Sequence, residues 1–196
     1  MKDLERRYAS DQISNSVVAE EQAAMYRGMT EGEMVAALED ITCIRGIDKT
    51  LRALRERQIE SLLCTVTWTF AAEEFQRRHH FLAASGTQIE LEDGVLTGSV
   101  LRHFDEWDKL DFVSAYCDSA GIRLDECIAV GDSRSDVPLF EEVGFAVAVN
   151  ASEQAREAAD VAVDTEDLTE VLQLIPDRPS GSKGRGRHPV PRIPLR

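Results

Sequence analysis

The feature that most constrains the fold is an alternation of short apolar runs with amphipathic segments, which extends from about residue 48 to residue 175. Apolar runs rich in β-branched residues predict buried strands, and the amphipathic segments between them predict helices. Strands that alternate with helices favour a mostly parallel sheet covered by helices on both faces, so the sequence predicts an α/β fold. We expect strands in the apolar runs at 61–66, 81–84, 127–130, 145–149 and 161–163.

Two segments depart from this alternation. Asp93-Gly94 lies between two stretches of alternating polar and apolar residues, which is a strong signal for a β-hairpin. Residues 1–45 show only the 3- and 4-residue spacing of helices, and Thr30-x-x-Glu33 is a capping box before the second apolar run. The N-terminal part is therefore expected to be helical throughout.

Charge is unevenly distributed along the 196 residues, whose 36 acidic and 22 basic side chains give a net charge of −14. Residues 176–196 hold six basic residues, one acidic residue and five of the six prolines, so we expect this segment to be a disordered basic tail. The acidic body argues against a nucleic-acid surface on the core. We divide the chain into a helical cap-like region (1–45), an α/β core (46–175) and the tail (176–196).

The four cysteines never form a Cys-x-x-Cys pair, which favours a reduced, cytoplasmic protein. The N-terminus lacks an apolar stretch of the signal-peptide type. The longest uncharged run before the tail, 61–72, is far shorter than the roughly 20 residues of a membrane helix. We expect neither secretion nor a membrane partner.

Ligands of open parallel sheets bind beyond the carboxyl ends of the strands, so polar residues that follow apolar runs are candidate site residues. After the run at 127–130, Gly131 permits a tight turn, and Asp132 and Asp136 stand four residues apart. Paired carboxylates at a strand end suit Mg²⁺, which takes oxygen ligands and keeps several waters. The alternative is that Asp132 or Ser133 only caps the helix that follows.

A second strand end carries Thr67, whose hydroxyl and backbone lie beside a helix start where a phosphate can bind. The alternative is that the threonines occur here only because they favour strands and because one of them caps the helix that follows. Lys109 begins the helix before the strand at 127–130, and a lysine at a helix N-terminus opposes the helix dipole. Taken alone, such a lysine is most often a solvated surface charge.

In this order and spacing, these pieces resemble the haloacid dehalogenase-like hydrolases, and within them the phosphoserine-phosphatase-like branch with a helical cap. The resemblance covers about residues 4–175. It is strongest over 128–140, which contains the family's Gly-Asp-x-x-x-Asp metal motif. It implies a Rossmann-like fold and Mg²⁺-dependent hydrolysis of a small phosphorylated metabolite.

The resemblance also implies a role for each candidate residue. Asp132 matches a direct Mg²⁺ ligand, and Asp136 belongs to the same metal site, where it holds the lysine and metal-bound water. Thr67 and Lys109 match the phosphate-binding residues, and Lys109 is also catalytic because it neutralises the phosphoryl group and the nucleophile. Ser135 stands where the family carries a residue near the substrate.

One part of the family pattern has no match. The family's nucleophile lies in an Asp-x-Asp-x-Thr motif at the end of the first, central strand, and the 196 residues contain no Asp-x-Asp. Without that strand, a slot about 10 Å wide with unpaired backbone groups would separate the strands that end near Thr67 and at Asp132. We therefore expect the chain alone to be inactive.

Three explanations are open. The first, which we favour, is that the true start of the protein lies upstream. The second is that the chain is a non-catalytic phosphate-binding or regulatory relative whose gap is closed by the cap, the tail or another chain. The third is that it is a fragment that folds poorly.

Overall fold

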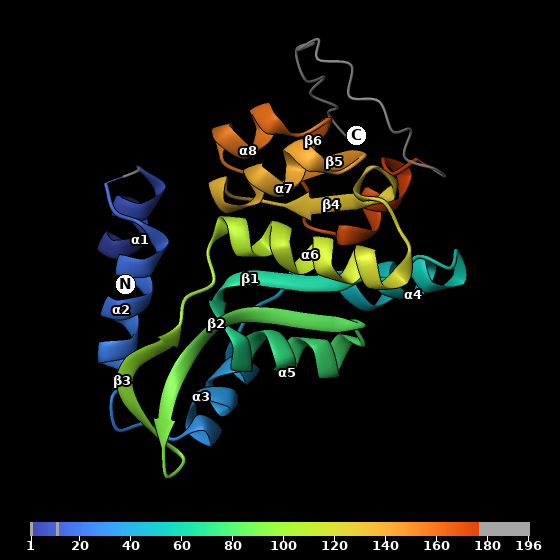
Figure 1. Ribbon diagram of the computed structural model, residues 1–196. Coiled ribbons are helices and arrows are strands. Elements are labelled where there is room, and N and C mark those ends of the chain that lie inside the picture. Colours follow the sequence, from blue (N-terminus) through green and yellow to red (C-terminus); the bar gives the residue numbers. More distant parts are fainter. Residues whose placement is uncertain (1, 11, 177–196) are drawn as a thin grey trace. The chain divides into compact units, whose positions relative to one another are not determined.

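The structure is a computed structural model that describes residues 2–10 and 12–176, which form a mixed α/β protein (Figure 1). The chain divides into two compact units. Unit 1 comprises Met1–Cys43 and Glu60–Asp105, and unit 2 comprises Ile44–Ile59 and the chain from Glu106 onward. The predicted division at residue 45 stays a prediction, and residues 177–196 of the predicted tail, 176–196, lie outside the described residues.

Unit 1 contains a three-stranded sheet in the order β1-β2-β3, with β1 parallel and β3 antiparallel to β2. Helix α5 packs against β1 and β2, and α2 packs against β3. The described part of residues 1–45 contains helices and no strand. The elements are α1 (Lys2–Ala9), α2 (Asn15–Met25), α3 (Glu31–Ala37), η1 (Leu38–Asp40), β1 (Leu62–Trp68), α5 (Thr69–His79), β2 (Ala83–Glu92) and β3 (Val95–Arg102).

The predicted hairpin is confirmed as the β2–β3 pair, with Asp93 and Gly94 at positive φ angles of 51° and 79°. The prediction of a separate short strand at 81–84 is wrong, because β2 continues through Gly86 into the hairpin. A Cβ atom on Gly86 would lie 2.7 Å from the backbone oxygen of Thr67. Glycine therefore allows β2 to lie close against the end of β1.

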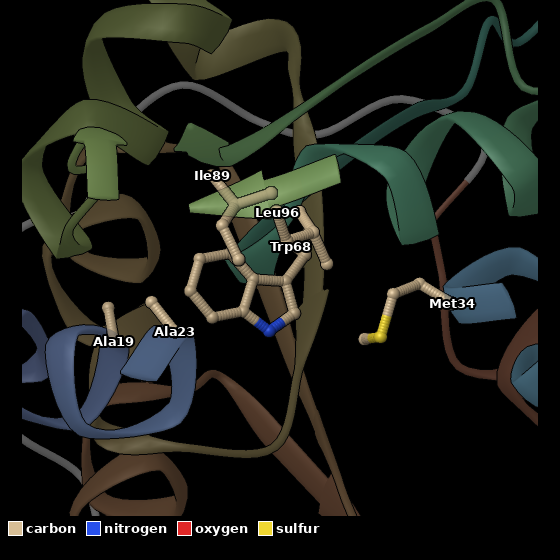
Figure 2. Close-up of a cluster of buried hydrophobic side chains, with 6 residues drawn as sticks. All are labelled: Ala19, Ala23, Met34, Trp68, Ile89 and Leu96. Atoms are coloured by element: carbon tan, nitrogen blue, oxygen red, sulfur yellow. The ribbon is translucent and has the colours of Figure 1, made fainter. Parts of the chain in front are cut away.

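The core of unit 1 is built around Trp68, at the end of β1 (Figure 2). Two alanines of α2 lie on one side of the indole ring, and Met34 of α3 lies on the other. The small alanine side chains let the helix approach the large indole ring. The cluster of buried residues is Ala19, Ala23, Met34, Trp68, Ile89 and Leu96.

Unit 2 contains a three-stranded parallel sheet in the order β4-β5-β6. The predicted strands are confirmed to within one residue, whereas the last predicted helix, 168–174, is a 3₁₀ helix. The elements are α4 (Ile47–Glu56), α6 (Glu106–Ala120), η2 (Leu124–Glu126), β4 (Ile128–Gly131), η3 (Arg134–Asp136), α7 (Val137–Glu142), β5 (Phe145–Val149), α8 (Glu153–Ala158), β6 (Val161–Val163) and η4 (Leu168–Gln173).

Strand β5 is buried on both of its faces, as expected for a parallel strand between helical layers. Val147 and Val149 join Val171 of η4 in one apolar cluster. Helices α7 and α8 also pack against β5. This burial explains why β5 reads in the sequence as a continuous apolar run.

The six described strands form two sheets, whereas a Rossmann-like fold with its central strand would have one. Within the described residues, β1 pairs only with β2 and β4 pairs only with β5, so each has one free edge. The α/β class with parallel strands is confirmed. Among the described residues, no helix combines the length and the apolar character that crossing a bilayer requires.

Candidate active site

The loop after β4 is folded around the carboxylate of Asp136. Oδ2 of Asp136 accepts hydrogen bonds from the backbone N–H groups of Asp132 and Ser133, at 3.0 and 2.9 Å. A Cβ atom on Gly131 would lie 2.4 Å from Cγ of Asp136, so only glycine leaves room for this carboxylate. The loop therefore needs the Gly-Asp-x-x-x-Asp pattern for steric as well as chemical reasons.

Lys109, in the first turn of α6, is tied to the same carboxylate. Its Nζ donates hydrogen bonds to Oδ1 of Asp136 at 2.6 Å and to Oγ of Ser135 at 2.8 Å. Lys109 is 4% exposed and Asp136 is 8% exposed. A buried charge needs a charged or hydrogen-bonding partner, and Lys109 and Asp136 are such partners for each other. The interpretation of Lys109 as a surface charge is therefore wrong.

Ser135 and Ser133 complete this network. Ser135 is 1% exposed, and its Oγ lies 2.8 Å from Oγ of Ser133. Ser133 and Asp136 also form a capping box at η3. Ser133 thus caps the helix, as the alternative interpretation expected. The Asp136 carboxylate takes part in this cap and also binds Lys109. The sequence reasoning considered Ser133 only as a cap and missed its contact with Ser135.

Asp132 differs from its neighbours because it is exposed at the tip of the loop. Partial burial of its carboxyl group raises its pKa, and the negative charge of Asp136 raises it further, while Lys109 acts in the opposite direction. A cation bound to the carboxylate would relieve this electrostatic cost.

These residues fit a Mg²⁺ ion with Asp132 as the protein ligand. Both oxygens of Asp136 already hold hydrogen-bond donors of the protein. Within the described residues, no group of three or more His, Cys, Asp and Glu side chains is placed to hold a metal. Mg²⁺ commonly takes only one or two carboxylates and completes its octahedron with waters or phosphate oxygens.

Thr67 belongs to unit 1 and is an exposed residue, one position before the end of β1. The backbone around it is held by hydroxyl groups, since Thr87 donates to the carbonyl of Val66 at 2.9 Å and Thr69 donates to that of Gly86 at 2.7 Å. The structure thus brings four predicted site residues together in unit 2, and it places Thr67 on a separate, well-anchored strand end.

The sequence matches a known family over most of its length. The model of the haloacid dehalogenase-like hydrolases matches residues 4–141. The chain belongs to the haloacid dehalogenase-like hydrolase family. The matched range includes α6 with Lys109 and the whole loop after β4 with Asp132 and Asp136.

Curated relatives within this family include phosphoserine phosphatases. The chain is 26% identical to that of Methanocaldococcus jannaschii over 140 residues, which cover 71% of this chain and 66% of the relative. It is 23% identical to that of Archaeoglobus fulgidus over 173 residues, which cover 88% of this chain and 50% of the relative. The chain thus spans between half and about two thirds of the length of these relatives.

Solved structures of haloacid dehalogenase-like hydrolases have the same fold. A phospho-aspartyl intermediate analogue of phosphoserine phosphatase matches with a TM-score of 0.81 at 21% identity, over 89% of this chain and 84% of that chain. A substrate-bound phosphoserine phosphatase matches with a TM-score of 0.82 at the same identity and coverage. The predicted Rossmann-like fold class is therefore confirmed.

Proposed function

We propose that this family member is a Mg²⁺-dependent phosphomonoester hydrolase that acts on a small phosphorylated metabolite. In this proposal, the described chain supplies the phosphate- and metal-binding side chains, and the attacking aspartate comes from a segment that the 196 residues do not contain. The observation that carries the proposal is the buried Lys109 cation, held by Asp136, whose carboxylate also accepts a hydrogen bond from the backbone N–H of Asp132.

The proposed roles follow from the chemistry of phosphoryl transfer, which depends mainly on positioning and charge neutralisation. Lys109 neutralises a phosphoryl oxygen while Asp136 holds its ammonium group in place. Asp132 binds Mg²⁺, which when bound neutralises charge on the phosphoryl group. Thr67 donates a hydrogen bond to the phosphate. Ser135 accepts a hydrogen bond from Lys109, and in this proposal it helps to position the ammonium group that binds the phosphate.

The similarity to phosphoserine phosphatases makes O-phosphoserine the first substrate to test. A cytoplasmic location is part of the proposal and is supported by the four cysteines, which are free thiols in the described chain. The alternative function is a phosphate-binding or regulatory relative without turnover. The two functions differ in whether an attacking aspartate completes the site, since the 196 residues contain no Asp-x-Asp.

The test compares two proteins in a steady-state assay with Mg²⁺, O-phosphoserine and a chromogenic aryl phosphate. One is the 196-residue chain, and the other carries an added N-terminal strand with Asp-x-Asp-x-Thr. We expect no turnover by the first, because Thr67, Lys109 and Asp132 supply no nucleophile in their proposed roles. We expect saturable turnover by the second, which Asp132→Asn should reduce by orders of magnitude.

Two other outcomes are informative. Robust turnover by the 196-residue chain that is lost on changing one of its own aspartates, such as Asp105 or Asp108, would show that the nucleophile is misassigned. An extended chain that binds Mg²⁺ and inorganic phosphate in calorimetry but never turns over would select the non-catalytic alternative.

A further inference from the structure

Two cysteines of unit 2 are in direct contact. Sγ of Cys117, in the last turn of α6, lies 3.4 Å from Sγ of Cys127, which immediately precedes β4. Cys117 is buried and Cys127 is half-buried. Cys117 and Cys127 lie on either side of η2, which packs against α6. The packing within unit 2 therefore holds the two sulfurs close together.

The distance between the sulfurs is close to that of a disulfide. An S–S bond is about 2.05 Å long, so the sulfurs would need to approach by only a little over 1 Å from 3.4 Å. Side-chain rotation with small backbone shifts supplies displacements of this size. The chain between the two residues is short, since they are ten positions apart.

We propose that Cys117 and Cys127 are a reversible oxidation site, which a low-molecular-weight disulfide converts to an intramolecular disulfide that links the end of α6 to the start of β4. The site is distinct from the proposed metal and phosphate site. It concerns the same two elements, because α6 begins near Lys109 and β4 ends at the Asp132 loop. The link therefore fixes the framework on which both residues are mounted.

The reaction balances as two thiol–disulfide exchanges with oxidised glutathione. The thiolate of one cysteine attacks a glutathione sulfur, the glutathione S–S bond breaks, and one glutathione thiolate leaves. The second cysteine, after losing its proton, then attacks the protein sulfur of this mixed disulfide and releases the second glutathione. Two protein thiols are oxidised, and one oxidised glutathione is reduced to two thiols.

The surroundings make this reaction slow at neutral pH. Burial raises the pKa of Cys127 to about 12, with further contributions from Cys117 and from the negative charges of Glu126 and Asp125. Only the thiolate is nucleophilic, so the thiol form resists oxidation. We expect the exchange rate to rise between pH 7 and pH 9, because the fraction of thiolate rises with pH.

The experiment equilibrates the full chain in reduced and oxidised glutathione buffers at pH 8.5, quenches with acid and maps the tryptic peptides by mass spectrometry. Trypsin places each cysteine in a different peptide, which makes the assignment unambiguous. We expect one cross-linked species that joins peptides 110–123 and 124–134, while peptides 28–45 and 58–77 keep free thiols. Thermal unfolding of the oxidised chain should occur several degrees above that of the reduced chain, because the link constrains the unfolded state.

Matched variants separate this site from general thiol oxidation. Cys117→Ser and Cys127→Ser should each abolish the cross-link, whereas the double variant Cys43→Ser/Cys64→Ser should retain it and its thermal shift. If a serine variant fails to fold, peptide mapping of the unmodified chain alone decides. The proposal is overturned if only mixed disulfides with glutathione or links to Cys43 or Cys64 form, or if the oxidised chain unfolds no higher than the reduced one.

Discussion

Lys109 and Asp136 are the residues on which the proposed site depends most directly, because each satisfies the buried charge of the other. The 2.6 Å contact between them also fixes the loop that presents Asp132. In water such a pair contributes little, but in a buried position the loss of one partner leaves an uncompensated charge. The chemistry of the site and the stability of unit 2 are therefore coupled at these two side chains.

We predict that Lys109→Met lowers the free energy of unfolding by about 3–5 kcal/mol, because Asp136 is then buried without its cation. Lys109→Met combined with Asp136→Asn should cost less than the sum of the two single changes. Urea unfolding of the 196-residue chain is the measurement. Lys49→Met, at an exposed position of α4, is the control and should change little. Equal losses for Lys109→Met and Lys49→Met would contradict the buried-pair interpretation.

We predict that Asp132→Asn weakens Mg²⁺ binding in calorimetry but raises the thermal midpoint in EDTA at pH 7. The raised pKa of Asp132 means that its ionised form carries a cost in the fold. That cost is present at neutral pH and is relieved as the pH falls through the folded-state pKa, so the advantage of the variant should shrink on acidification. Asp118→Asn, at the far end of α6, is the control. An unchanged Mg²⁺ affinity in Asp132→Asn would remove Asp132 from the metal site.

At the scale of elements, short-range signals place helix starts accurately. The capping box read from Thr30 and Glu33 is present at α3, where Thr30 Oγ1 accepts from the backbone N–H of Glu33 and the Glu33 carboxylate accepts from that of Thr30. The hydrogen bonds from the Thr30 backbone and side chain lower the pKa of Glu33. The start of α3 is thus stabilised by an ionised carboxylate.

We predict that Thr30→Ala costs about 1 kcal/mol of stability at pH 7, the usual effect of losing a helix cap. The contribution of Glu33 is present above its unfolded-state pKa, about 4.3, and is lost as the pH falls through its lower folded-state pKa. Urea unfolding at pH 7 and pH 3 should therefore show a larger effect of Glu33→Ala at pH 7. Thr42→Ala, at an exposed position outside the helix, serves as the comparison. A Glu33→Ala effect that does not depend on pH would contradict the ionised cap.

At the scale of the whole molecule, the net charge of −14 acts on every element at once. Self-repulsion among like charges destabilises a compact state, and salt screens it over about 10 Å at 0.1 M ionic strength. We predict that the thermal midpoint rises between about 10 and 150 mM NaCl, more than in an equal concentration of a neutral solute. A midpoint that falls or stays constant with salt would show that local ion pairs outweigh the global repulsion.

The sequence by itself was sufficient for features whose cause is local. β5 and β6 were predicted at their observed bounds because continuous apolar runs favour buried parallel strands. The hairpin at Asp93-Gly94 was predicted from two residues that tolerate positive φ. The candidate site after β4 was located for the same reason, since a strand, a glycine and two carboxylates follow one another within a few positions.

Only the tertiary structure decided which distant residues meet. Lys109 and Asp136 are 27 positions apart, and the residues around Lys109 give no local signal of their contact, which only the resemblance to the family implies; that the pair is buried comes from the structure alone. The contact of Trp68 with the alanines of α2 has no local signal in the sequence either. Such contacts depend on how whole elements pack. Bringing distant residues together costs chain entropy, and only the apolar surface buried and the hydrogen bonds formed by the assembled elements offset that cost.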